Sequence, residues 1–122
     1  MESPAHEPDR VVSAVDLAER FAEFARAARG SAIKNRNKGD QFGEKLANTR
    51  AEVYVQAAEL VRAMPLPQAA ATMMERAGRL HVRTPPLMGF DDAGTRYIAA
   101  RAWQFCALEI NPELEHAAPQ WT

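Results

Sequence analysis

Residues 97–110 read YIAARAWQFCALEI, and only three of these side chains, Arg101, Gln104 and Glu109, are strongly polar. A helix over this stretch is apolar around most of its circumference, and such a helix is normally surrounded by other elements. We therefore expect a helix over about 92–110 at the centre of the fold, held by the first two helices of the chain. The single tryptophan of this stretch is expected to be mostly buried, and its cysteine to be a core residue.

The apolar residues near the start of the chain predict a first amphipathic helix over about 11–29. They recur at spacings of three and four and fall on one stripe: Ala14, Leu17, Ala18, Phe21, Phe24, Ala25 and Ala28. Gly30 is expected to end this helix, since glycine is common just past a helix C-terminus. Residues 31–39 contain glycine, serine and two asparagines without sustained periodicity, and they are expected to form a loop.

Two further helices are expected over about 40–63 and about 67–80. The first of these begins at Asp40, a good N-cap residue, and ends before Pro65, because proline disfavours the helical conformation of the preceding residue. Gly78 weakens the second by about 1 kcal/mol relative to alanine. The apolar face of the helix over 40–63 is expected to comprise Phe42, Leu46, Val53, Ala57, Leu60 and Met64, widened by Tyr54 and Val61.

Four helices joined by loops of moderate length predict an all-α fold, a compact bundle of about four helices. We expect a single helical domain over 10–111, with a flexible polar arm over 1–9 and a polar tail over 112–122. In an alternative arrangement the first two helices form a hairpin whose exposed stripe is completed by another copy of the chain. The wide stripe of the second helix therefore predicts self-association as a homodimer, with the two-fold symmetry that is commonest.

The composition is that of one globular domain: 122 residues, 47% hydrophobic and 25% charged. The longest apolar runs are four residues, against about 18 for a spanning helix, so we expect no membrane segment and no membrane partner. The first 25 residues hold no continuous apolar segment and predict no secretory signal. A single cysteine excludes an internal disulfide and fits a reducing compartment, so we expect a cytoplasmic protein.

No arrangement of residues typical of catalysis or cofactor binding occurs in the sequence. The six glycines form no phosphate-binding pattern, and His6, His81 and His116 lie in three different segments. Glu113, Glu115 and His116 are metal-ligand types, but they lie in a polar tail without the supporting shell that metal sites need. We therefore expect a non-enzymatic protein without cofactor or metal.

Residues 26–50 form a basic block that follows an acidic one. They hold seven basic and two acidic residues, a net charge of +5, whereas the two basic and six acidic residues of 1–25 give −4. Interleaved asparagines and a glutamine could donate hydrogen bonds to phosphate or to base edges. The same charges would equally serve to balance the acidic segments, and both interpretations stay open. The candidate contacts for nucleic acid or an acidic partner are Arg26, Arg29, Lys34, Arg36, Lys38 and Lys45.

The loop after the third helix is more apolar than a solvated loop requires, since it carries Leu87, Met88 and Phe90. These side chains are expected either to cap the end of the bundle or to form a contact for a partner protein. Taken together, the patterns predict a small non-enzymatic helical protein that acts by binding another protein or a second copy of itself. The alternatives are a nucleic-acid-binding module that uses residues 26–50, and an enzyme assembled at an oligomer interface.

Overall fold

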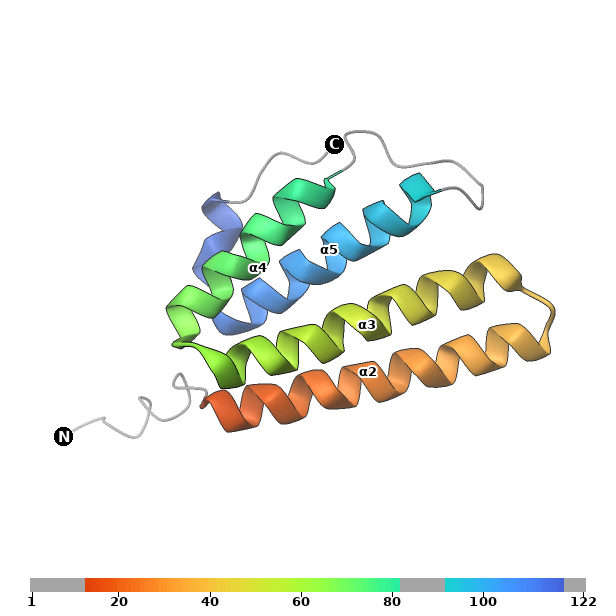
Figure 1. Cartoon of the computed structure of the whole chain (residues 1–122), viewed down its shortest axis with the longest axis horizontal. Helices are drawn as coiled ribbons and strands as arrows, with labels where there is room; N and C mark the ends of the chain where they lie inside the picture. Colours follow the sequence, from red (N-terminus) through yellow and green to blue (C-terminus); the bar gives the residue numbers. More distant parts are fainter. Residues whose placement is uncertain (1–12, 82–91, 118–122) are drawn as a thin grey trace.

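The computed structural model describes residues 13–81 and 92–117, and within these two ranges it contains no strand. The α-helices are α2 (Ala14–Asn37), α3 (Gln41–Ala63), α4 (Leu66–Leu80) and α5 (Asp92–Ile110), and a short 3-10 helix, η2 (Pro112–Ala117), follows α5. The prediction of an all-α bundle of four helices is confirmed (Figure 1). None of the helices described is both long and apolar enough to cross a membrane.

The four helices form two antiparallel pairs, with α2 beside α3 and α4 beside α5 (Figure 1). α5 packs chiefly against α4 and α3, whereas α2 packs chiefly against α3. The expectation that the first two helices hold the last one is therefore only partly right: α3 packs against α5, but α4 contacts α5 more than α2 does, and α2 reaches it through contacts such as the Arg20–Glu109 ion pair at 2.9 Å. The buried face of α4 consists of three alanines and Met73. The small alanine side chains let α4 lie close to α5, in the place expected for α2.

Helix α2 runs through Gly30 to Asn37, so the predicted end at residue 29 and the predicted loop over 31–39 are wrong. The additional turns bury Ala32, which is 2% exposed, on the side of α2 that packs against α3. A glycine inside a helix costs only about 1 kcal/mol, and the added packing outweighs this cost. The helix ends instead at Asn37, and the turn that follows contains Gly39, whose φ of 79° is a backbone conformation that favours glycine.

The predicted bounds of the other three helices agree with the structure to within one residue, whereas α2 begins at Ala14, three residues after the predicted start at 11. Asp40 caps α3 by accepting a 2.8 Å hydrogen bond from the Gly43 N–H, and Met64 is extended before Pro65. Ser13 caps α2 in the same way, accepting from the Asp16 N–H at 3.0 Å. The bounds of α3 were predictable because Asp40 and Pro65 are local start and stop signals.

The core lies where all four α-helices meet. Its largest fully buried side chains are Phe21, Leu17, Met73, Val61 and Cys106, which come from all four helices. Trp103 is 3% exposed and belongs to the same cluster, which confirms the prediction that it is buried. We call the part of the α2–α3 hairpin that carries Leu17, Phe21 and Val61 the core end.

The other end of the hairpin, residues 28–51 around its turn, we call the tip. Its buried side chains are alanines of α2 and α3 that lie outside the main core cluster: Ala28, Ala32, Ala47 and Ala51. Phe42 and Leu46, predicted for the buried face of α3, are only half-buried. The predicted face is wrong here because alanine permits the closest approach of two helices, and a ranking by hydrophobicity favours larger side chains.

Candidate functional site

Three aromatic side chains from three different helices form a cluster at the boundary between the core end and the tip. Phe24 of α2 lies 5.5 Å from Tyr54 of α3 and 5.5 Å from Phe105 of α5, measured between ring centroids. Tyr54 and Phe105 are 6.3 Å apart in an edge-on arrangement. These separations lie within the range in which aromatic rings attract each other.

Phe105 is 41% exposed, although the sequence predicted that α5 would be enclosed on all sides. The prediction fails at this position because α5 packs chiefly against α4 and α3, and the contacts of Phe105 with Phe24 and Tyr54 cover only part of its ring. An exposed phenylalanine that is held in place by two other rings is a fixed apolar surface, and apolar surface of this kind suits contact with a partner.

A surface hollow of about 220 Å³ adjoins this cluster, which we call the aromatic hollow. It is lined by Phe24, Ala27, Ala28, Ser31, Arg50, Tyr54 and Phe105. Sites for small molecules and cofactors mostly measure about 300–1,000 Å³, so this hollow is small for such a ligand. Its size and its apolar walls suit one side chain of another protein.

Three polar side chains line the hollow: Ser31, Arg50 and Tyr54. Arg50 forms no ion pair with any residue that the structure describes, so its guanidinium is available to a carboxylate. Burial raises the pKa of Tyr54, the nearby Cys106 adds to this rise, and Arg50 opposes it. Tyr54 therefore keeps its proton at neutral pH and offers a neutral hydroxyl.

A second hollow, of about 360 Å³, lies over Trp103, between α3, α4 and α5. The guanidinium of Arg76 lies 5.0 Å from the centroid of the Trp103 ring, a cation–π contact. The same group is 3.4 Å from the Gln56 side-chain oxygen. Because this arginine already covers the ring, the aromatic hollow is the better candidate for a partner.

The sequence predicted neither a reactive thiol nor a metal site. Cys106 is fully buried, and burial together with the nearby Glu109 raises the pKa of its thiol, which keeps it protonated and unreactive. This confirms that Cys106 is a core residue. No group of three or more His, Cys, Asp or Glu side chains that could hold a metal ion occurs within the described ranges.

The basic block is spread over α2, the turn and the start of α3. Three of its six candidate residues are close to carboxylates of the same hairpin: Arg26 to Glu23 at 2.6 Å, Arg29 to Glu52 at 3.9 Å and Arg36 to Glu44 at 3.0 Å. All three arginines are more than half exposed, and such surface pairs contribute about 0–1 kcal/mol each. Much of the positive charge of the block is therefore balanced within the hairpin itself.

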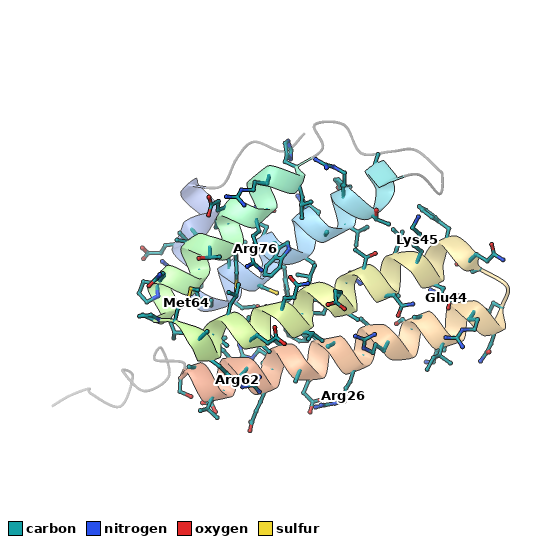
Figure 2. The ribbon with its side chains drawn as sticks, viewed as in Figure 1. Arg26, Glu44, Lys45, Arg62, Met64 and Arg76 are labelled. Atoms are coloured by element: carbon teal, nitrogen blue, oxygen red, sulfur yellow. The ribbon has the colours of Figure 1, made fainter. Side chains whose placement is uncertain are left out.

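Lys34 and Lys38 form no ion pair with the described residues, and both are exposed at the tip. Lys45 is exposed near the start of α3, next to Glu44 (Figure 2). At about 100° per residue, Lys34 lies on a different side of α2 from Arg29 and Arg36. The structure thus distributes the candidate residues around the hairpin and does not gather them on one face.

The other predicted contact, formed by Leu87, Met88 and Phe90, lies outside the residues that the structure describes. The sequence interpretation missed the aromatic hollow because it assigned Phe24, Tyr54 and Phe105 to buried faces. One local signal was present: Arg50 and Tyr54 are four residues apart in α3 and so share a face. The contribution of Phe105 depends on how α5 crosses the hairpin, which the sequence pattern does not specify.

Comparisons with protein-family models, with curated proteins and with solved structures find no match to this chain. A function must therefore be argued from the physical features of the molecule. The features with most bearing on it are the partly exposed ring of Phe105, the Arg50 guanidinium, which no carboxylate of the described residues pairs with, and the burial of Cys106.

Proposed function

We propose that this protein is a small non-enzymatic helical protein that binds another protein through the aromatic hollow. The observation that carries the proposal is the exposure of Phe105, which is 41% exposed although two other aromatic rings hold it in place. Aromatic and arginine side chains supply most of the binding energy in many protein interfaces. The hollow offers both types side by side.

The chemistry of the hollow defines the partner segment. Its aromatic walls and its volume of about 220 Å³ suit one large apolar side chain. Arg50 at its edge would bind a carboxylate, and a charge-assisted contact of this kind adds specificity. The expected partner therefore presents a leucine-, methionine- or phenylalanine-like residue close to an aspartate or glutamate.

The non-enzymatic part of the proposal is supported by the burial of Cys106, since a thiol needs exposure and a lowered pKa to act as a nucleophile. A cytoplasmic location is part of the same proposal. It is supported by the presence of a single, free cysteine, which is typical of a reducing compartment.

The test compares what three forms of the full chain capture from a nuclease-treated lysate of the cells that make the protein. The forms are the wild type, Phe105→Asp and the control Ala71→Asp, which adds the same charge at an exposed position of α4. Proteins bound by the wild type and the control but lost by Phe105→Asp support the proposal. Capture of the same proteins by all three forms contradicts it.

Once a partner is purified, the contribution of Arg50 can be measured separately. Arg50→Glu should weaken binding by about tenfold or more, since it replaces an attractive contact with a like-charge contact. Circular dichroism of each variant checks that the helices remain intact. Unchanged affinity would show that the hollow does not bind the partner's carboxylate.

We also propose, as a second candidate, that the tip binds nucleic acid through residues 26–50. It is supported by Lys34 and Lys38, which are exposed and form no ion pair with the residues described. Arg26 and Arg36 favour it less, because carboxylates lie within 3.0 Å of both.

A further inference from the structure

One side of α2 carries a mostly exposed stripe that lies beside the face packed against α3. Its members are Val15, Glu19, Ala22, Arg26, Arg29 and Ile33, which at about 100° per residue fall within an arc of about 80°. Val15 is 67% exposed and Ile33 is 51% exposed, unusual values for large apolar side chains. We call this set the outer stripe. It faces away from Phe24 and the aromatic hollow.

The outer stripe is complementary to itself when its direction is reversed. Val15 and Ile33 lie nine residues before and after position 24, and Glu19 and Arg29 lie five residues before and after it. A second α2 running antiparallel, with the two-fold axis at this level, would therefore place Glu19 opposite the Arg29 of the other copy. It would place Val15 opposite Ile33 in the same way. Two-fold contacts require this kind of self-complementarity.

From this arrangement we propose that the outer stripe is the interface of an antiparallel two-fold homodimer. Each of the two contacts, between Glu19 and Arg29 and between Val15 and Ile33, then occurs twice. The apolar contact at each end removes from water the two exposed large apolar side chains of α2.

Two charged side chains of the stripe, Glu19 and Arg29, are available for this contact. Glu19 forms no ion pair with the residues described. Arg29 lies 3.9 Å from Glu52, beyond hydrogen-bond distance. Arg26, in contrast, is held by Glu23 of its own helix at 2.6 Å. Glu19 and Arg29 are therefore the two members of the stripe best placed to pair with a second copy.

The surface beside the stripe is concave and extends the contact area onto α3. A groove of about 280 Å³ is lined by Ala22, Ala25, Arg26 and Arg29 of α2 and by Val55, Ala58, Glu59 and Arg62 of α3. Figure 2 shows Arg26 and Arg62 on this hairpin, with Arg26 projecting away from α4 and α5. The alanine floor lets another helix approach closely, as a second copy of α2 would.

The size of this face predicts a weak dimer. From Val15 to Ile33 the stripe is about 27 Å long, and two adjacent helices are about 20 Å wide. Such a face covers on the order of 540 Å² in projection, near the lower limit for a specific interface. A dissociation constant in the micromolar range is therefore expected. The aromatic hollow lies on the other side of α2, so a dimer would present two hollows and gain avidity for a multivalent partner.

The test uses sedimentation velocity of the full chain at concentrations from about 10 to about 300 µM, where a weak dimer dissociates on dilution. Glu19→Arg places two arginines opposite each other at both contacts, and Arg29→Glu places two glutamates there. Each variant alone should dissociate at least about tenfold more readily than the wild type. An equimolar mixture of the two should associate like the wild type, because every charge then faces its opposite.

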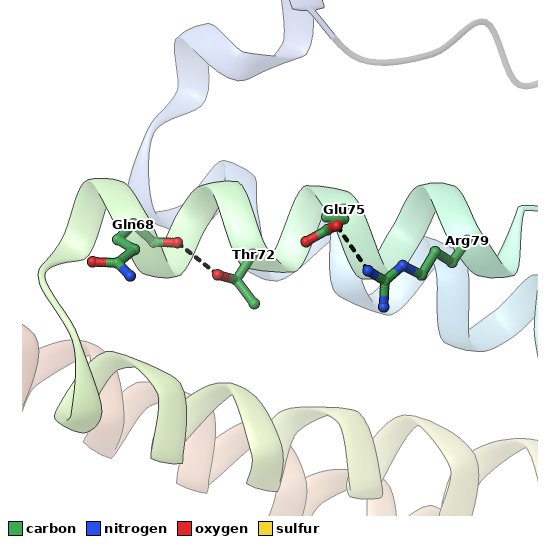
Figure 3. Close-up of polar contacts among 4 residues, drawn as sticks. All are labelled: Gln68, Thr72, Glu75 and Arg79. Carbon is green, nitrogen blue, oxygen red and sulfur yellow. Dashed lines mark hydrogen bonds and ion pairs between the residues drawn. The ribbon is translucent and has the colours of Figure 1, made fainter.

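The matched control reverses the same charges on α4, where Glu75 and Arg79 pair at 2.8 Å within one helix (Figure 3). Glu75→Arg and Arg79→Glu, alone or mixed, should leave sedimentation unchanged. A wild type that stays monomeric at the highest concentration overturns the proposal, as does a mixture of Glu19→Arg and Arg29→Glu that fails to associate. The inference is independent of the proposed function, because protein capture through Phe105 is read from a different face and by a different variant.

Discussion

The two ends of the α2–α3 hairpin are built from the same two helices but are stabilised differently. At the core end, Leu17, Phe21 and Val61 pack with Met73 of α4 and Trp103 of α5. At the tip, only alanines are buried between the two helices. Burial of one methyl group contributes about 0.8 kcal/mol, whereas a large side chain contributes about 1.5–3 kcal/mol. Most of the stability of the fold should therefore come from the core end.

This difference also explains where the aromatic hollow lies. Phe24, Tyr54 and Phe105 are the last large side chains before the alanine-lined tip begins. At this boundary α2 and α3 continue without α4 beside them (Figure 1). A rigid core thus ends in an open surface, which leaves Phe105 partly exposed.

The largest expected effect comes from truncating the core end. Trp103→Ala should lower the free energy of unfolding by about 3–5 kcal/mol, since it removes a large buried side chain. Urea denaturation followed by circular dichroism measures this change. Phe105→Ala is the control, and it should cost clearly less because that ring is partly exposed. A loss of less than about 1 kcal/mol for Trp103→Ala would place this ring outside the core.

A smaller effect is expected from overfilling the tip. Ala51 is fully buried in α3, so Ala51→Leu should force the two helices apart and cost about 1–3 kcal/mol. Asn48→Leu adds a similar side chain at an exposed position of the same helix and should change stability by no more than about 0.5 kcal/mol. Equal effects of the two substitutions would show that the tip has no close helix contact to disturb.

Two glycines of the tip should respond in opposite directions. Gly30 is inside α2, and a Cβ added there meets nothing within 4 Å, so Gly30→Ala should stabilise the protein by about 0.5–1 kcal/mol. Gly39 has a φ of 79°, so Gly39→Ala should destabilise it by about 1–2 kcal/mol. Thermal denaturation of both variants gives the sign of each change in stability. Destabilisation by Gly30→Ala would argue against a continuous α2.

The sequence predicted α3, α4 and α5 to within one residue because local signals, such as Asp40 and Pro65, define their ends. It misplaced the end of α2 because the packing of Ala32, a contact between distant residues, overrides the local preference of Gly30. The aromatic hollow depends on contacts among three helices. No periodicity in a single helix could have predicted that Phe105 would be partly exposed.

The charge of the tip is tested by titrating the protein into duplex DNA, single-stranded DNA and RNA. Binding is followed by fluorescence polarisation at two salt concentrations. If Lys34 and Lys38, which pair with no carboxylate of the described residues, each neutralise one phosphate, the log–log slope of affinity against salt is about −2 on duplex DNA. Reversal of both charges should then weaken binding to all sequences alike, because phosphate contacts carry no base information. Absence of binding to all three probes at low salt removes the second candidate function.

Native-state hydrogen exchange tests most directly the claim that the hairpin is stabilised unevenly. Amides of α2 near Phe21 and of α3 near Ala58 should exchange only on global unfolding. Amides of residues 31–36 and 44–50, at the tip, should exchange through local opening at clearly lower free energy. The fall in protection along the two helices should occur near Phe24 and Tyr54. Equal protection along the whole length of α2 and α3 would contradict the account.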